Sequence, residues 1–548
     1  MRIGVNPFGR KTDFYLKKNR AHPEAVTHYG CVKLLVVHNH FRPGGVRRVI
    51  ELATPHLVRS TSPGFDEVSL VGGEAPDEPW WRRFAEALSP IPVTGAFDRA
   101  LGYWSEQRTR AGAMRRQIRG LLDPLVTGEG KCVVWAHNQG LGRNLILTQE
   151  LQQLCAERRV KLVLHHHDWW FDNRWQRWTE MQAAGFLTLK AVAEVILGAT
   201  PNVRHVAINR TDARILETQL QRQAGWLPNP AETGSPTKPG ATRRARQWLA
   251  SELGDNAPVW LLPCRLLRRK NLAEAVLLAR WLRPEAWLVT TGGISSAEEE
   301  AYAKALDWIA RQQGWRLRLG ILAEAEAHKP EVAELMSASE AVLLTSLQEG
   351  FGLPYLEAVA ARRPLIARAL PNIMPDLQRF GFRFPQTYEE LLVAPSLFNW
   401  GRESRRQQRL FSQWRSRIPA SRRRLAGTPW LLAADRGPVP FSRLTLTAQL
   451  EVLSLPVEES WEACARLNPF LNGWRELAGG GRLGLADWPE KAAQYLSSEA
   501  YARNWNRILA LVNTPPAPAG TPMKAQDQFI RERLAMANLY PLTWTTKT

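Results

Sequence analysis

The chain has 548 residues, of which 45% are hydrophobic and 23% charged, and its formal net charge is +20. This balance excludes a disordered or fibrous chain, and the length exceeds one ordinary domain, so two large α/β domains with an added region are expected. The positive charge attracts anions in general, which leaves nucleic acid, an anionic membrane surface and anionic small substrates as candidate partners.

Arginine far outnumbers lysine and is scattered along the sequence, without a helix-turn-helix, RNA-binding or zinc-finger motif. A specific nucleic-acid partner is therefore not expected, and anionic small substrates rank above a peripheral contact with anionic membrane. The sequence lacks an apolar run of roughly 18 residues and a secretory signal, so a cytoplasmic protein is expected. Its five cysteines are odd in number and include no C-x-x-C pair, which predicts neither a disulfide framework nor a zinc site.

Residues 1–30 are polar and lack clear periodicity, so they are expected to form an N-terminal extension. Val32 to Val37 then has the pattern of a buried strand, and the pair Gly44-Gly45 separates it from a helical stretch that begins near Val49. This order predicts a strand, a glycine turn and a helix. The glycine pair alone is a weak signal, and a simple tight turn explains it equally well.

Strand and helix patterns go on alternating up to residue 226. Further strands are expected at residues 67–71, 131–135, 160–164 and 203–208. The alternation predicts a parallel, doubly wound sheet, whose ligands bind beyond the carboxyl ends of its strands. Ten of the eleven histidines precede residue 206. The polar wall of a binding site is therefore expected in this first domain, residues 31–226.

The cluster His165-His-His-Asp168 directly follows one of these predicted strands. Three interpretations remain open, namely a metal site, a structural hydrogen-bonded cluster, or one imidazole that faces a substrate. Adjacent side chains on an extended chain point to alternate sides, which disfavours a metal site made by neighbouring histidines.

A segment rich in Pro, Gly and Thr, residues 228–242, indicates a hinge near residue 226. A second α/β domain is expected over residues 227–400. From about residue 401 to residue 548 the chain is basic and mostly helical in pattern, and its role is open. One of its helices is a candidate to cross back to the first domain, and the remainder is a candidate for an acceptor site or an oligomer contact.

The second domain begins with a buried strand that ends shortly before Arg265 and Lys270. Two cations at the carboxyl end of a strand are placed to stabilise the charge that develops on a leaving diphosphate. The alternative is a solvated basic turn, and this is the interpretation preferred for the neighbouring Arg268 and Arg269.

The organising stretch of the sequence joins a strand at Ala341 to Leu344 with a glycine loop and a helix. In the loop, Gly350 and Gly352 bring the backbone close to a ligand, and Pro354 suits the first turn of a helix because that position needs no N–H. Free N–H groups at a helix start favour phosphate binding. An ordinary strand-helix-strand turn is the alternative.

Glu349 and Glu357 flank this loop with seven residues between them, Ser346 precedes them, and Gly350-Phe-Gly-Leu-Pro354 lies within. The stretch resembles the corresponding motif of the retaining, nucleotide-sugar-dependent glycosyltransferases of family 4 (group 1). The resemblance covers roughly residues 32–395. It implies the α/β fold called GT-B, in which two Rossmann-like, doubly wound domains face each other across a cleft, here with an additional helical C-terminal region.

The resemblance also implies an activity. A hexose would pass from a nucleotide diphosphate sugar, such as UDP-glucose or GDP-mannose, to an unknown acceptor hydroxyl, with retention of anomeric configuration, by a front-face mechanism without a metal or cofactor. The catalytic residues that it implies are Arg265 and Lys270 on the departing diphosphate, Glu349 on the sugar hydroxyls, and His166 on the sugar or the acceptor. The donor-binding residues that it implies are Gly44, Gly45, Phe351, Gly352, Leu353 and Glu357, the last on the ribose hydroxyls. The alternatives are a noncatalytic sugar-nucleotide-binding protein and a basic nucleic-acid-binding protein.

Overall fold

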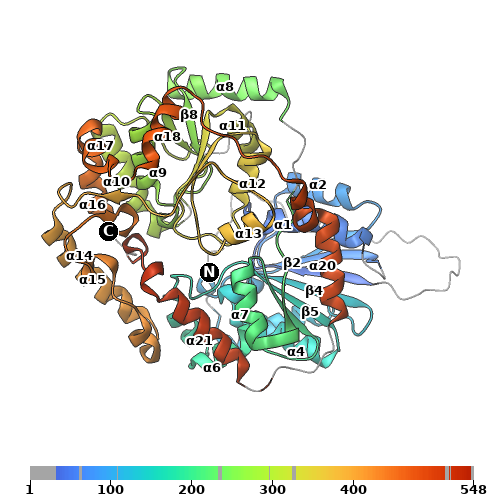
Figure 1. Ribbon diagram of the computed structural model, residues 1–548. Helices are drawn as coiled ribbons and strands as arrows, with labels where there is room; N and C mark the ends of the chain where they lie inside the picture. The colour runs from blue at the N-terminus through green and yellow to red at the C-terminus, as the bar shows by residue number, and fades with distance from the viewer. Residues whose placement is uncertain are drawn as a thin grey trace, which may run out of the picture.

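The computed structural model contains two α/β domains and a helical C-terminal region, which Figure 1 shows in colours from blue to red. The structure describes residues 32–60, 64–107, 109–231, 237–294, 296–323, 329–511, 518 and 520–544. The predicted extension at residues 1–30 lies outside these residues. In the part of the chain that the structure describes, no helix is both long and apolar enough to span a bilayer.

The first domain is built on a seven-stranded parallel sheet in the order β3-β2-β1-β4-β5-β6-β7. Its strands are β1 (Lys33–Val37), β2 (Glu67–Gly72), β3 (Val93–Phe97), β4 (Cys132–His137), β5 (Lys161–His166), β6 (Val203–Ala207) and β7 (Ala224–Trp226). Its helices are α1 (Gly45–Ser60), α2 (Glu78–Leu88), α3 (Ala111–Leu122), α4 (Leu145–Glu157), α5 (Arg177–Ala183), α6 (Leu189–Ile196) and α7 (Arg210–Leu220).

Both faces of this sheet are covered, as a parallel sheet requires. Along β1, Leu34 and Val36 belong to one hydrophobic core, whereas Leu35 and Val37 belong to the core on the opposite face. The strand therefore has no polar side, which explains its continuous apolar sequence. The strand order reverses direction between β1 and β4, and a ligand-binding crevice is expected at that point of such a sheet.

The second domain is built on a six-stranded parallel sheet in the order β10-β9-β8-β11-β12-β13. Its strands are β8 (Val259–Leu262), β9 (Trp287–Thr290), β10 (Leu317–Arg318), β11 (Ala341–Leu344), β12 (Leu365–Arg368) and β13 (Gln386–Tyr388). Its helices are α8 (Pro239–Leu253), α9 (Leu272–Leu282), α10 (Ala297–Gln312), α11 (Val332–Ala338), α12 (Leu353–Ala360) and α13 (Met374–Arg379). The strand order again reverses, between β8 and β11.

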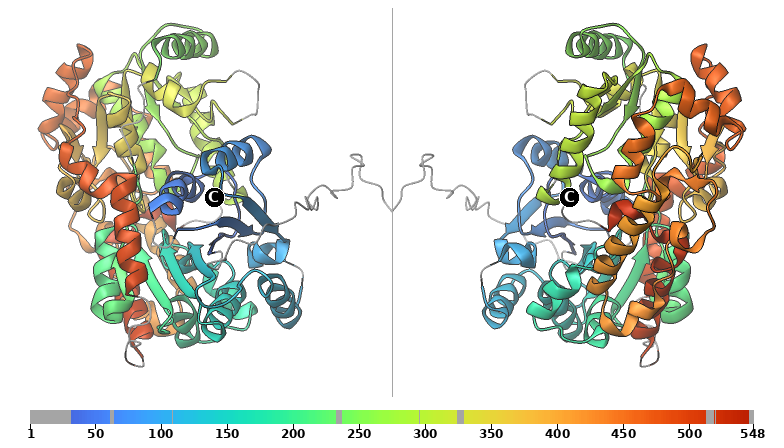
Figure 2. Two further views of the ribbon diagram at one scale, coloured as in Figure 1. Left: turned by 90° about the vertical axis from the view of Figure 1, so that its right-hand side faces the viewer. Right: turned by 90° about the vertical axis from the view of Figure 1, so that its left-hand side faces the viewer.

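The C-terminal region adds eight helices among the described residues and a short antiparallel pair, β14 (Leu392–Val393) with β15 (Val439–Pro440). The helices are α14 (Trp400–Arg417), α15 (Trp430–Ala433), α16 (Leu446–Leu453), α17 (Val457–Ala465), α18 (Phe470–Gly479), α19 (Ala493–Leu496), α20 (Ser498–Ala510) and α21 (Thr521–Arg533). Figure 2 shows these orange and red segments along one side of the molecule, from one domain to the other.

Two helices of this region return to the first domain. Helix α20 packs on α1, and its Trp505 also meets Trp135 of β4 at 5.3 Å between ring centroids. Helix α21 packs on α6 and α7, and its Phe529 contacts Trp169, in the loop after β5, at 4.6 Å between ring centroids. Helices α16, α17 and α18 instead pack on α9 of the second domain. The region therefore covers both domains and is not a separate unit.

The predicted fold is confirmed, since two Rossmann-like domains face each other in the GT-B arrangement with a helical C-terminal region. They touch at the carboxyl ends of their strands. Asn209 donates from Nδ2 to the carbonyl of Gly350 at 3.1 Å, and the backbone N–H of Arg210 donates to Asp376 at 2.7 Å. The cleft lies beside these contacts.

Candidate active site

A cleft of about 860 Å³ lies between the two domains. This volume is near the upper end of the roughly 300–1,000 Å³ that small-molecule sites occupy. Nine of the ten residues predicted for the site line it, and they come from both domains. They are Gly44, Gly45, Arg265, Lys270, Glu349, Phe351, Gly352, Leu353 and Glu357. The tenth, His166, does not line the cleft.

The centre of the cleft holds an ion pair between Lys270 and Glu349, with both side chains almost buried. The Glu349 carboxylate also accepts from Ser346 Oγ at 2.6 Å and from Arg269 Nη1 at 3.3 Å. Burial acts to raise the pKa of Glu349, but the charges of Lys270 and Arg269 outweigh it and lower the pKa to about 2. Glu349 is therefore an anion near neutral pH and not a proton carrier.

Arg269 belongs to this centre, which corrects the expectation of a solvated basic turn. It lines the cleft and donates to the carbonyl of Gln348 at 2.9 Å as well as to Glu349. Its neighbour Arg268 is also buried, and its side chain donates to Glu299 at 3.1 Å. The sequence around these arginines does not indicate that they are paired, because their partners Glu349 and Glu299 lie 80 and 31 residues away.

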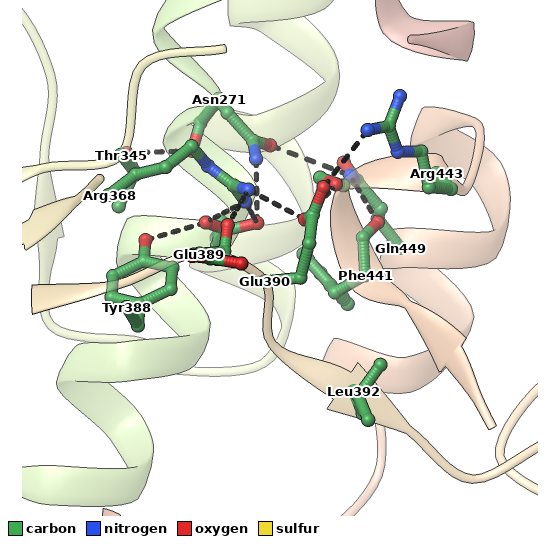
Figure 3. A network of polar contacts seen from close by, with 12 residues as sticks. Asn271, Thr345, Arg368, Tyr388, Glu389, Glu390, Leu392, Phe441, Arg443 and Gln449 are labelled. Atoms are coloured by element: carbon green, nitrogen blue, oxygen red, sulfur yellow. Dashed lines mark hydrogen bonds and ion pairs between the residues drawn. The ribbon is translucent and has the colours of Figure 1, made fainter. Parts of the chain in front are cut away.

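A buried polar network holds the turn that carries Lys270 (Figure 3). Thr345 Oγ1 donates to the carbonyls of Lys270 and Asn271 at 2.9 and 3.1 Å, and the amide of Asn271 donates to Glu274 at 2.9 Å. Arg368 donates to both carboxylate oxygens of Glu274 at 2.5 and 2.6 Å. Asn271 has a positive φ of 50°, so these contacts fix a backbone conformation that is uncommon outside glycine.

The same network extends into the C-terminal region. Arg443 donates to Glu390 at 3.1 Å and to the carbonyls of Ala537 and Leu539 at 2.9 and 3.0 Å. Arg368 donates to the other oxygen of Glu390 at 2.6 Å. The C-terminal region therefore supports the Lys270 turn from behind. Local sequence patterns do not reveal this support, because Arg443 lies 53 residues from Glu390 and 94 and 96 residues from Ala537 and Leu539.

The glycine loop leads into α12 as predicted. Gly352 has a φ of 85°, α12 begins at Leu353, and Pro354 lies in its first turn. A Cβ on Gly350 would lie 2.8 Å from the carbonyl oxygen of His167, so the loop approaches the first domain as closely as backbone allows. Glu357, farther along α12, exposes its carboxylate to the space of the cleft.

The prediction of His166 as a site residue is wrong by one position. Side chains alternate along β5, so His165 and His167 share one side and His166 points to the other. There His166 Nε2 lies 3.0 Å from His205 Nδ1, and its ring stacks on Trp169 with centroids 4.3 Å apart. His167, which lines the cleft beside Asp168, takes the predicted position.

Three imidazoles of the first domain, one of them His167, could hold a metal ion beside the cleft. The ligand atoms of His137, His165 and His167 lie within 4.8 Å of one another, a grouping that adjacent residues alone did not predict. Burial lowers the pKa of all three rings, which keeps them in the neutral form that metals bind. Two of the rings also form a hydrogen bond with each other, between His137 Nδ1 and His167 Nε2 at 3.0 Å. Metal independence stays a prediction.

Comparison with known families identifies part of the chain. Residues 250–381 match the model described as Glycosyl transferases group 1. This stretch begins within α8, ends just after α13, and contains both the Lys270 turn and the glycine loop.

Three curated relatives are similar to the chain at low identity. Mannosylglucosyl-3-phosphoglycerate synthase of Petrotoga mobilis is 22% identical over 375 residues, which cover 66% of this chain and 69% of that protein. Mannosylglucosylglycerate synthase of Thermotoga maritima is 25% identical over 238 residues, which cover 40% of this chain and 54% of that protein. The serotype-specific mannosyltransferase WbdA of Escherichia coli is 26% identical over 200 residues, which cover 33% of this chain and 23% of that protein.

Two solved structures are similar to the chain. Anabaena Alr3699/HepE in complex with UDP-glucose aligns with a TM-score of 0.49 at 14% identity, covering 87% of this chain and 99% of that chain. An alpha,alpha-trehalose-phosphate synthase (UDP-forming) from Burkholderia vietnamiensis aligns with a TM-score of 0.40 at 12% identity, covering 64% of this chain and 87% of that chain.

Proposed function

We propose that the protein moves a hexose from a nucleotide diphosphate sugar to an acceptor hydroxyl, with retention of anomeric configuration and without a metal. The match of residues 250–381 to the group 1 glycosyltransferase model supports the transferase class. The observation that carries this proposal is the Lys270–Glu349 pair beside the glycine loop, in the cleft between the domains. The pair supports the proposal because it holds a cation for the diphosphate and an anion for the sugar hydroxyls next to each other.

The diphosphate binds between Arg265 and the start of α12. The Arg265 side chain is exposed in the cleft and has no ion-pair partner among the described residues, so its charge is available to phosphate. Burial and then the neighbouring charge of Arg269 lower its pKa, which an incoming anion would reverse. The loop from Phe351 to Leu353 adds backbone N–H groups at a helix start.

In the transfer step the bond between the anomeric carbon and the diphosphate oxygen breaks, and its electron pair stays on that oxygen. The acceptor hydroxyl oxygen bonds to the same carbon from the same face, and its proton passes to the leaving phosphate. Arg265 and Lys270 stabilise the charge that grows on the leaving group, which is the largest contribution expected from such a site. Glu349, with a pKa of about 2, accepts hydrogen bonds from the sugar and takes no proton. Glu357 accepts from the ribose hydroxyls.

The hexose is proposed to be mannose. The names of all three curated relatives refer to mannosyl products, which favours GDP-mannose over UDP-glucose as the donor to test first. The carboxylate of Glu357 would bind the ribose of either nucleotide, so it does not distinguish the two bases.

Isothermal titration with GDP-mannose and UDP-glucose tests this assignment on the wild type, on Lys270→Ala and on Glu357→Ala. Both variants should weaken donor binding about tenfold or more. Lys304→Ala is the matched control, because this lysine is exposed on α10 and pairs only with Glu300 among the described residues. A folded wild type that binds neither donor would overturn the proposal.

Turnover then separates a transferase from a sugar-nucleotide-binding protein. Release of nucleotide with formation of a new glycoside is expected in the presence of an acceptor, and proton NMR of the product reports its anomeric configuration. Donor binding without turnover over a broad acceptor panel would favour the noncatalytic alternative, and an inverted product would contradict the front-face mechanism.

A further inference from the structure

The cleft carries more positive charge than a donor diphosphate needs. Eleven Lys and Arg side chains line it, against five Asp and Glu. Those of the second domain surround the donor position described above. Six arginines line the wall that the first domain contributes, and they are Arg42, Arg47, Arg48, Arg143, Arg174 and Arg177.

Arg143 differs from the other five because it has no carboxylate partner among the described residues. Arg42, Arg47, Arg48, Arg174 and Arg177 each form an ion pair with a nearby acid. Arg143 is half-buried, and the charges of Arg177 and Arg174 lie close to it. Burial, followed by the charge of Arg177, lowers the pKa of Arg143 to about 10, although the charge of Glu180, the ion-pair partner of Arg177, acts in the opposite direction. A half-buried cation without a carboxylate partner of its own is stabilised when an anion joins it.

The surroundings of Arg143 hold its side chain in place. The guanidinium lies over the ring of Tyr103, with Cζ 4.4 Å from the ring centroid, and the Tyr103 hydroxyl lies 2.8 Å from His40 Nε2. The backbone N–H of Trp104 donates to the Arg143 carbonyl at 2.8 Å. Arg143 Nε and His40 Nδ1 are enclosed polar atoms without a hydrogen-bond partner. The subsite therefore has an unused donor on Arg143 and an unpaired ring nitrogen on His40.

The subsite faces the donor position across the cleft. Arg265, on the second domain, interacts electrostatically with both His40 and Tyr103, although the three residues come from different loops. A group bound at Arg143 therefore lies on the acceptor side of the diphosphate position. It does not compete with Lys270 and Glu349, which belong to the opposite wall.

We infer that the acceptor carries an anionic group, a phosphate or a carboxylate, and that Arg143, supported by Tyr103 and His40, binds it. The inference rests on the proposed transferase function and adds the chemical class of the second substrate. A guanidinium held over an aromatic ring presents its N–H groups in the fixed, planar geometry that matches phosphate and carboxylate oxygens. The acceptor hydroxyl is then held next to the anomeric carbon, and the neutral part of the acceptor contributes the remaining specificity.

The first experiment compares acceptors that differ in charge but keep the same carbon skeleton. Full-length protein with saturating donor is supplied with glucose, glucuronate or glucose 6-phosphate, and with glycerol, glycerate or glycerol 3-phosphate, while nucleotide release is followed. The charged member of a series should be used with a KM at least about tenfold lower than that of the neutral member. Equal use of neutral and charged members would overturn the inference. The phosphate and carboxylate members distinguish the two anions.

The second experiment assigns the effect to Arg143. Arg143→Gln should raise the KM for a charged acceptor about tenfold or more and leave donor affinity unchanged. Arg143→Lys should recover part of the loss. Arg116→Gln is the matched control, since Arg116 is exposed on α3 and does not line the cleft. An unchanged KM in Arg143→Gln would overturn the assignment.

A binding measurement covers the case in which none of these acceptors is turned over. The protein is saturated with the nucleoside diphosphate of its donor and titrated with inorganic phosphate, so that the donor position is already filled. Phosphate binding that Arg143→Gln weakens supports the inference, and the absence of any binding overturns it. Failure of the transferase function is a separate result, because the wild type would then bind no donor in the titrations above.

Discussion

Arg368 Nη2 donates to both carboxylate oxygens of Glu274, at 2.5 and 2.6 Å, and this ion pair lies in the interior of the second domain directly behind the turn that carries Lys270. Glu274 is fully buried and Arg368 is 2% exposed. Burial raises the pKa of Glu274 despite this pairing, so the carboxylate depends on Arg368 and on the hydroxyl of Tyr388 to stay ionised. The position of Lys270, the proposed catalytic cation, is thus linked to the stability of the domain core.

Arg368→Met should lower the free energy of unfolding by about 3–5 kcal/mol, because it leaves Glu274 as an uncompensated buried charge. Urea denaturation measures the change. Arg311→Met provides the control, since the pair of Arg311 with Asp307 is exposed and its loss should cost no more than about 1 kcal/mol. Equal effects of the two substitutions would contradict the role given to the buried pair.

The stability contributed by Glu349 should depend on pH. Its pKa is about 2 in the folded protein against 4.5 for an ordinary glutamate, so the unfolded state binds more protons between these values. The contribution is complete above the unfolded pKa and is lost as pH falls from 4.5 toward 2. The gap in free energy of unfolding between wild type and Glu349→Gln should therefore be widest near pH 7 and narrow below about pH 4.5. A gap independent of pH would exclude this mechanism.

Gly350→Ala should separate the two domains at their closest approach. The added methyl group would lie 2.8 Å from the His167 carbonyl oxygen and 3.0 Å from Ile208 Cδ1. The resulting displacement of the glycine loop should lower kcat/KM by about tenfold or more, because the reacting groups on the two walls lose their alignment. Gly473→Ala in α18 is the control, since its Cβ meets no atom within 4 Å. Steady-state kinetics distinguish the two variants, and equal kcat/KM values would refute the close contact.

Removal of divalent metals should leave turnover unchanged. In the proposed mechanism Arg265 and Lys270 supply the positive charge that a metal ion would bring to a departing diphosphate, so dialysis of the full-length protein against EDTA is expected to have no effect on kcat. If activity is lost and zinc or magnesium restores it, the prediction fails. The buried group His137, His165 and His167 is then the first place to test, with His165→Asn as the variant.

Sequence patterns were sufficient to predict the parts of the site whose residues lie close together in the sequence. The glycine loop, Pro354 and the two glutamates lie within one short stretch, and a strand end followed by a helix start restricts where their backbone can go. Helix α9, Leu272–Leu282, is similarly local, because apolar residues continue around most of it. The prediction of His166 as a site residue was wrong because a register error of one residue moves a side chain to the other side of a strand.

Sites assembled from distant loops were beyond local patterns. His40, Tyr103 and Arg143 follow three different strands, and none of them belongs to a recognisable motif. Arg443 gave no signal either, since its partners Glu390 and Leu539 lie 53 and 96 residues away. Strand β3 was missed because it is an edge strand with Gly95 at its centre and with half-exposed neighbours.

The C-terminal region has a practical consequence for dissecting this protein. The chain enters the second domain after Trp226 and returns to the first at α20. Its last described residues contribute to both cores, Tyr540 and Leu542 to that of the second domain and Leu539 and Trp544 to that of the first. The C-terminal region therefore connects the two domains through contacts at several points. A fragment that ends at the first hinge would lose Trp505 and Phe529 from its core and expose Trp135 and Trp169 to water. Neither sheet is expected to fold as an isolated domain. The cleft can open only as far as the segments that cross between the domains can bend.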